Sequence, residues 1–265
     1  PLVELPRLAD HAGVARVWAK DESRRELGSF KALGGMYAGL RALARAAGVP
    51  TIEHLVTAKD PSRSLHTLIC ASDGNHGLAV AAAAELAGAA ARIYLHRHVP
   101  AARARRIAER GAQIVWVDGT YDDAVDEAAR AAGRREGLLI ADTSADAGDP
   151  VVADVMAGYG LMAREIIAQW NSADGAPSIR PPTHEPPTHL FVQAGVGGLA
   201  AALAAGLRAP WPHLRVIVVE PAGVACVGAA LRTGRIERIA GDLDTAAEML
   251  SCGEASAPAV AILRE

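Results

Sequence analysis

The chain has 265 residues, of which 51% are hydrophobic and 22% charged, and its formal net charge is −3. This composition is typical of a globular protein with a sizeable apolar core. The scattered arginines form no basic run for nucleic acid, and no apolar stretch approaches the roughly 20 residues that span a bilayer. No secretory pattern opens the chain, so we expect a cytoplasmic protein whose partners are small molecules.

Apolar, β-branched runs alternate with alanine-rich helical patterns along most of the chain. The expected strands cover residues 16–19, 66–71, 92–95, 113–117, 138–140, 189–193 and 215–220. The expected helices cover residues 32–47, 77–87, 101–110, 121–132, 153–170 and 199–207. Because strands that alternate with helices pair in parallel through right-handed crossovers, we expect an α/β fold of mostly parallel twisted sheets flanked by helices.

Lysine is rare in this chain, since only Lys20, Lys31 and Lys59 accompany the many arginines. An amine can form an imine with an aldehyde cofactor, whereas a guanidinium cannot. Lys31 lies in the sequence Ser-Phe-Lys-Ala-Leu-Gly-Gly, where an expected helix begins. The helix dipole disfavours an ammonium there, so we expect a lowered pKa for Lys31, which suits a nucleophile or a base. The alternative is an ordinary surface lysine.

A polar cluster connects an apolar strand to an alanine-rich helix in the sequence Ala-Ser-Asp-Gly-Asn-His-Gly, residues 71–77. Asp73, Asn75 and His76 follow the carboxyl end of the strand, where open α/β sheets place their ligands. A helix cap needs only one such residue. We therefore interpret the cluster as a binding or catalytic loop, with helix capping as the alternative.

A glycine-rich segment follows another expected strand and opens another helix. Its backbone N–H groups would point outward together with the helix N-terminus, which is typical of a phosphate cradle. The residues of this cradle are Gly195, Val196, Gly197, Gly198 and Leu199.

The same glycines allow two other interpretations. Gly195, Gly197 and Ala200 also fit the dinucleotide-binding pattern, with Glu220 at the end of the next strand, where a ribose-binding acid belongs. A nicotinamide-dependent oxidoreductase is therefore an alternative of a different class. A tight strand-to-helix turn without any ligand is the other.

Cysteines and histidines carry weaker signals. Cys70, Cys226 and Cys252 are too few and too scattered for a disulfide framework or a zinc site, so we expect free thiols. His96 and His98 lie on one face of a strand without a neighbouring acid or thiol cluster, and we expect no metal there.

The motifs Lys-Asp-Glu-Ser, Ser-Phe-Lys, Asp-Gly-Asn-His-Gly and Gln-Ala-Gly-Val-Gly-Gly together resemble the tryptophan-synthase-β-like, fold type II enzymes that use pyridoxal 5'-phosphate (PLP). Within this group the chain looks most like the diaminopropionate ammonia-lyase family. The resemblance runs from about Lys20 to Cys252 in order and spacing. It implies a homodimer, a larger cofactor-binding domain at residues 1–49 and 145–265, and a smaller domain at residues 50–144.

The resemblance also implies how the cofactor is held. Lys31 would carry PLP as a Schiff base, Asn75 would contact the ring oxygen, and residues 195–199 would hold the phosphate. Glu220 would then be a strand-end residue without a dinucleotide role.

The implied reaction is elimination of 2,3-diaminopropionate to pyruvate and ammonia. Lys31 would act as the base for the L-isomer and Asp73 for the D-isomer. Asp142, in a segment similar to the family's Asp-Thr segment, would bind the distal ammonium, and His76 would belong to the substrate site. A threonine or serine dehydratase, a β-replacement synthase and a catalytically inactive relative remain alternatives.

The chain departs from the family pattern at two places. Ser144 and Ala145 follow the Asp-Thr segment, where an aromatic residue is expected. The family's C-terminal portion, with its partner for the pyridine nitrogen, is not found, and we expect it to be missing from this sequence.

Overall fold

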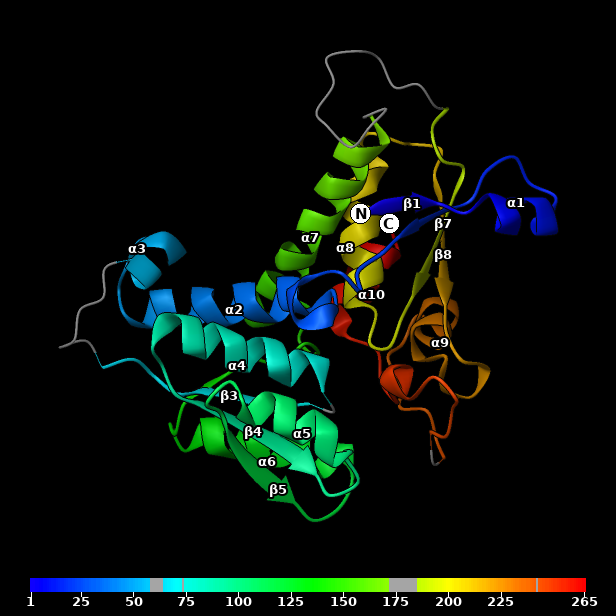
Figure 1. Cartoon of the computed structure of the whole chain (residues 1–265). Helices are drawn as coiled ribbons and strands as arrows, with labels where there is room; N and C mark the ends of the chain where they lie inside the picture. The colour runs from blue at the N-terminus through cyan, green and yellow to red at the C-terminus, as the bar shows by residue number, and fades with distance from the viewer. Residues whose placement is uncertain (58–63, 73, 172–184, 242) are drawn as a thin grey trace.

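The computed structural model describes residues 1–57, 64–72, 74–171, 185–241 and 243–265. The chain forms two parallel sheets that lie apart in Figure 1, the larger below the long helix α2 (Lys31–Ala46) and the smaller to its right. None of the described helices has the length and the apolar character needed to cross a membrane.

The larger sheet has four parallel strands in the order β5-β4-β3-β6. They are β3 (Leu68–Ala71), β4 (Ala91–His96), β5 (Gln113–Val117) and β6 (Leu138–Leu139). Three helices pack on this sheet: α4 (Asn75–Ala87), α5 (Ala101–Ala108) and α6 (Tyr121–Gly133). Because side chains alternate along a strand, Leu68 and Cys70 join the core shared with α4, whereas Ile69 packs with α6. Both faces of the sheet are therefore covered, as parallel sheets require.

The second sheet pairs β7 (His189–Gln193) with β8 (Arg215–Val219) in parallel. Helices α7 (Pro150–Trp170), α8 (Gly198–Arg208) and α10 (Ala257–Leu263) pack side by side next to it, and α9 (Cys226–Thr233) follows β8. Helix α7 begins where the Asp149 carboxylate accepts the N–H groups of Val151 and Val152, with Pro150 at the first helical position.

Shorter elements complete the chain. Strands β1 (Leu2–Glu4) and β2 (Trp18–Lys20) form an antiparallel pair, and α1 (Pro6–Ala12) lies between them in the sequence. The others are the helix α3 (Ile52–Thr57) and the 3-10 turns η1 (Glu26–Gly28), η2 (Ala222–Val224) and η3 (Glu248–Leu250).

The predicted α/β fold is confirmed, and the predicted strands 113–117 and 189–193 match β5 and β7 residue for residue. The strand predicted at residues 16–19 overlaps β2, whereas β1 and its antiparallel pairing with β2 were not expected. Helices α1, α3 and α9, of 7, 6 and 8 residues, were not expected either, because one or two helical turns display an apolar period only weakly. All strands of the larger sheet lie within residues 50–144, and the division into two domains stays a prediction.

Helix α2 crosses α7 at a contact made of backbone and small residues. A Cβ atom added to Gly158 of α7 would lie 2.8 Å from the Cα atom of Gly34, and still closer to the carbonyl oxygen of Leu33. The first turn of α2, which begins with Lys31, is thereby held directly against α7.

We expect Gly158→Ala to lower the free energy of unfolding by about 1–3 kcal/mol, because the added methyl group overpacks this contact. Gly160→Ala in the same helix is the matched control, since its Cβ would meet nothing within 4 Å. Alanine there should raise the stability by up to about 1 kcal/mol. Urea unfolding measures both, and equal effects of the two changes would contradict the tight crossing.

Candidate active site

A cavity of about 300 Å³ opens where the first turn of α2, the carboxyl end of β3 and the loop before α8 meet. It brings together nearly all of the residues that the sequence predicts for the site. Asp73 lies outside the described residues. The predicted residues that line the cavity are Lys31, Asn75, His76, Asp142, Gly195, Val196, Gly197, Gly198 and Leu199.

The Lys-Asp-Glu-Ser stretch does not line this cavity but anchors the chain that leads to Lys31. The Lys20 ammonium lies 2.7 Å from the Glu165 carboxylate of α7. Arg25 binds Glu165 through two hydrogen bonds of 2.6 and 2.8 Å and also binds Glu22. These ion pairs attach the segment before α2 to α7, and this explains the conspicuous polar motif as a structural support.

Lys31 forms an ion pair with Asp142, which follows β6 in the chain. Burial alone would lower the pKa of Lys31, but the Asp142 carboxylate, with smaller contributions from Tyr159 and Cys252, raises it above its usual value. Burial likewise opposes ionisation of Asp142, yet the Lys31 ammonium holds the pKa of this carboxyl well below its usual range. The expected lowering of the Lys31 pKa by the helix dipole is therefore wrong, because the nearby carboxylate dominates.

Two aromatic residues form part of the cavity wall, Phe30 of the Ser-Phe-Lys motif and Tyr159, which the sequence did not indicate. Tyr159 of α7 packs edge-on against Phe30, with ring centroids 5.3 Å apart, and both line the cavity beside Lys31. Burial raises the pKa of Tyr159 to about 12, so its phenol stays protonated at neutral pH. Nothing in the local sequence distinguishes this tyrosine from an ordinary core residue of a helix.

In the turn between β3 and α4, one residue caps the helix and other residues face the cavity. The Ser72 hydroxyl accepts hydrogen bonds from the backbone N–H groups of Gly74, at 3.1 Å, and Gly77, at 2.8 Å. Ser72 thus performs the capping function that the sequence left open for the whole cluster. Asn75, the first residue of α4, and His76 face the cavity.

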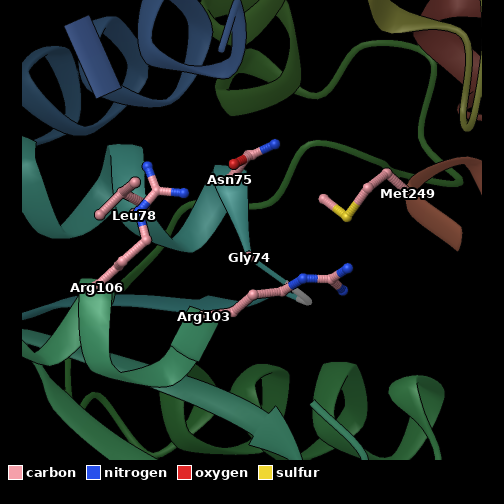
Figure 2. A pocket seen from close by; sticks show the side chains of 6 residues that line it. All are labelled: Gly74, Asn75, Leu78, Arg103, Arg106 and Met249. Carbon is pink, nitrogen blue, oxygen red and sulfur yellow. The ribbon is translucent and has the colours of Figure 1, made fainter. Parts of the chain in front are cut away.

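A smaller cavity of about 180 Å³ adjoins the first one and shares Gly74, Asn75 and Met249 with it. Figure 2 shows Arg103 and Arg106 of α5 beside the start of α4. The Arg103 guanidinium donates to Glu248 of η3 at 2.9 Å, and that of Arg106 donates to the Leu27 carbonyl of η1 at 3.0 Å. Arg103 therefore connects α5 to η3, and Arg106 connects it to η1.

The glycine-rich loop enters α8 without a side-chain cap. Gly197 has φ = +99°, a left-handed conformation that favours glycine. Among the hydrogen bonds of the described residues, none uses a backbone N–H group of residues 195–199 as its donor. Free N–H groups at the N-terminus of an 11-residue helix favour an anion. The loop therefore fits a phosphate, and the cavity between it and Lys31 has room for a pyridine ring.

Glu220 is engaged elsewhere. Its two carboxylate oxygens accept the N–H groups of Val227 and Gly228, each at 2.8 Å, and so cap the N-terminus of α9. This carboxylate is therefore not available for a ribose, and the nicotinamide alternative lacks its ribose-binding acid. Cys70, Cys226 and Cys252 form no disulfide in the described part of the chain, and Cys252 also lines the cavity, which the sequence did not indicate.

Comparison with known proteins agrees with these features. The family model described as pyridoxal-phosphate dependent enzyme matches residues 1–265. The chain belongs to this family. Its membership confirms the predicted cofactor class, and together with the observed α/β architecture it replaces the nicotinamide interpretation.

Individual relatives narrow the comparison. A diaminopropionate ammonia-lyase of Escherichia coli (strain K12) is 31% identical over 271 residues, covering 100% of this chain and 65% of the relative. A crystal structure of the holo form from E. coli superposes with a TM-score of 0.87 and covers the same shares. A probable D-serine dehydratase of Burkholderia thailandensis is 30% identical over 97% of this chain and 59% of the relative. The chain thus spans less than two thirds of the length of these relatives.

We expect Gly197→Ala to raise the Kd for PLP at least about tenfold, equivalent to about 1.4 kcal/mol. The new Cβ would lie 3.1 Å from Val227 and 3.3 Å from Ala259, so the loop must shift. Gly234→Ala is the matched control, because Gly234 also has a positive φ, +76°, but its Cβ would meet nothing within 4 Å. Absorbance titration with PLP measures both, and unchanged affinity in Gly197→Ala would contradict the cradle.

Proposed function

We propose that this protein catalyses the PLP-dependent α,β-elimination of 2,3-diaminopropionate to pyruvate and ammonia. The observation that carries the proposal is the carboxylate of Asp142, which faces the cavity and pairs with Lys31. If Lys31 holds the cofactor, this carboxylate needs another cation. The second ammonium group of a diamino acid supplies one.

The residues around the cavity fit PLP. Lys31 would hold the aldehyde carbon through its ε-nitrogen, Asn75 would contact the ring oxygen, and residues 195–199 would hold the phosphate. When bound, the cofactor supplies a ring that takes up the electrons left when the Cα proton departs.

Lys31 is the base that this chain offers for the L-isomer. Its amine must be neutral to accept the Cα proton, and the paired Asp142 keeps it charged. A substrate ammonium that takes over the carboxylate would lower the pKa of Lys31 again. Substrate binding would in this way prepare the base, and a substrate without a second ammonium would do so less well.

Asp142 distinguishes a diamino acid from a hydroxy amino acid. Its side chain is only 14% exposed, so a charge left without a partner there would cost several kcal/mol. The distal ammonium of diaminopropionate would restore the ion pair and stay protonated, which makes it a good leaving group. The hydroxyl group of serine or threonine has no charge to offer.

Two further side chains complete the proposed site. His76 would contribute to the wall that orients the substrate. Asp73 would take the Cα proton of the D-isomer from the face opposite Lys31. The proposal for Asp73 rests on the sequence motif.

A serine or threonine dehydratase of the same fold is the second candidate, and a relative named as a probable D-serine dehydratase supports it. The two candidates differ in the leaving group, an ammonium against a hydroxyl. The 2-oxo acid and ammonia formed from each substrate under identical conditions separate them, with pyruvate as the product of diaminopropionate and serine and 2-oxobutyrate as the product of threonine. A kcat/KM for serine above that for diaminopropionate would favour the dehydratase.

We expect Asp142→Asn to lower kcat/KM for diaminopropionate by about 100-fold, about 2.7 kcal/mol, because the distal ammonium loses its carboxylate. Residual serine turnover should fall by less than about tenfold, since serine makes no such pair. Asp146→Asn is the control, because Asp146 is exposed and only accepts the N–H of Gly148 nearby. Equal losses on both substrates would contradict the proposal that Asp142 binds the distal ammonium.

We expect Asp73→Asn to abolish turnover of D-diaminopropionate while sparing much of the activity on the L-isomer. The reason is that the two enantiomers present their Cα protons to opposite faces, and only one face would lose its base. Steady-state rates on each pure enantiomer decide the matter. Similar losses on both would refute the assignment of two separate bases.

A further inference from the structure

We infer that His76 is a positioning residue, a spacer that keeps the elements carrying Lys31 and Asp142 at the separation of their ion pair. The consequence for catalysis rests on the proposed function, whereas the spacing itself is a property of the folded chain. The ring of His76 contacts both elements.

The first contact is with the segment that carries Asp142. The Nε2 atom of His76 lies 2.9 Å from the carbonyl oxygen of Ile140. Strand β6 has only two residues, and beyond it the N–H of Ile140 still bonds to Ile69 at 2.8 Å. The His76 bond therefore fixes the last peptide group before the chain turns toward Asp142, two residues later.

The second contact is with the helix that carries Lys31. A Cβ atom on Gly35 would lie 3.3 Å from the Nδ1 atom of His76 and 2.6 Å from the Cβ of Ala79. Gly35 comes four residues after Lys31, so the two share one face of α2. The histidine ring thus rests on α2 one turn from Lys31, at a point where only glycine leaves it room.

The ring state suits a spacer better than an acid or a base. Since a carbonyl oxygen only accepts, Nε2 carries the proton, and Nδ1 is an acceptor. Nδ1 is buried and forms no hydrogen bond in the described part of the chain. Burial lowers the pKa of His76, whose residue is 4% exposed, so the ring is neutral at pH 7. A neutral ring does not compete with Lys31 for the Asp142 carboxylate.

Several titratable groups besides Asp142 act on Lys31, and the test has to separate them. They come from four different elements. They are Tyr159 of α7, Cys252 beside η3, His76 of α4 and Cys70 of β3. If the spacer is lost while the fold survives, only the distances from Lys31 to residue 76 and to Asp142 should change.

Three substitutions of His76 test the spacer. Gln places an amide N–H near the position of Nε2 and should keep the bond to Ile140, whereas Asn is too short to reach it. Leu fills the space without a donor. His54→Gln is the matched control, because His54 is an exposed residue of α3.

The measurement is the pH dependence of acetylation of Lys31 in cofactor-free protein, read by peptide mass spectrometry. Lys20, which pairs with Glu165, is the internal reference. We expect the midpoint for Lys31 to fall by at least about 1 pH unit in the Leu and Asn variants, because Asp142 moves away. The Gln variant and His54→Gln should keep the wild-type midpoint.

The steady-state pH profile of the holoenzyme is a second readout, in which the Leu and Asn variants should differ from wild type and from Gln. An unchanged Lys31 midpoint in folded Asn protein would overturn the spacer, and so would a Gln variant that shifts as far as Leu. If Leu fails to fold, the Asn and Gln pair decides. Acetylation uses no substrate, so its result tests the spacer independently of the proposed reaction.

Discussion

The largely buried ion pair of Lys31 and Asp142 is the interaction on which the site depends. An ammonium and a carboxylate with this little exposure are tolerated together, and each is costly without the other. The two residues are 111 positions apart in the sequence, and the fold brings the start of α2 next to the segment that follows β6. Helix α2 in turn is held against α7 by a glycine crossing, and the segment before α2 is attached to α7 by the ion pairs of Glu165. Lys31 is therefore placed by supports outside the cavity.

The cavity lies where the ends of elements from both sheets converge. The parallel strands β3 and β7 each lead into a helix whose first turn faces the space between them, α4 with Asn75 and His76, and α8 with its free N–H groups. This arrangement places donors for anions on two sides of the cavity and the ion pair next to them. Neutral His76 and protonated Tyr159 add bulk without adding charge, so the balance of charge at the cavity wall is set by Lys31, Asp142, Glu248 and the ligands.

The sequence predicts features whose chemistry is local and fails for those that need the fold. The glycine loop and the strands β5 and β7 follow from nearby residues alone. The raised pKa of Lys31 does not, because the helix dipole visible in the sequence is weaker than a carboxylate that only folding brings near. Glu220 shows the same limit, because an acidic residue at the end of β8 could either bind a ribose or cap α9, and the sequence alone does not distinguish the two roles. Tyr159 and Cys252 enter the cavity with no local signal at all.

Covalent attachment of the cofactor to Lys31 is the central claim, and the rarity of lysine makes it directly measurable. Reduction of the purified holoprotein with borohydride, followed by proteolysis and mass spectrometry, fixes the cofactor to the nitrogen that holds it. The account predicts that the added mass appears on the peptide that contains Lys31. The same mass on the peptide of Lys20 or Lys59, with Lys31 unmodified, would contradict it.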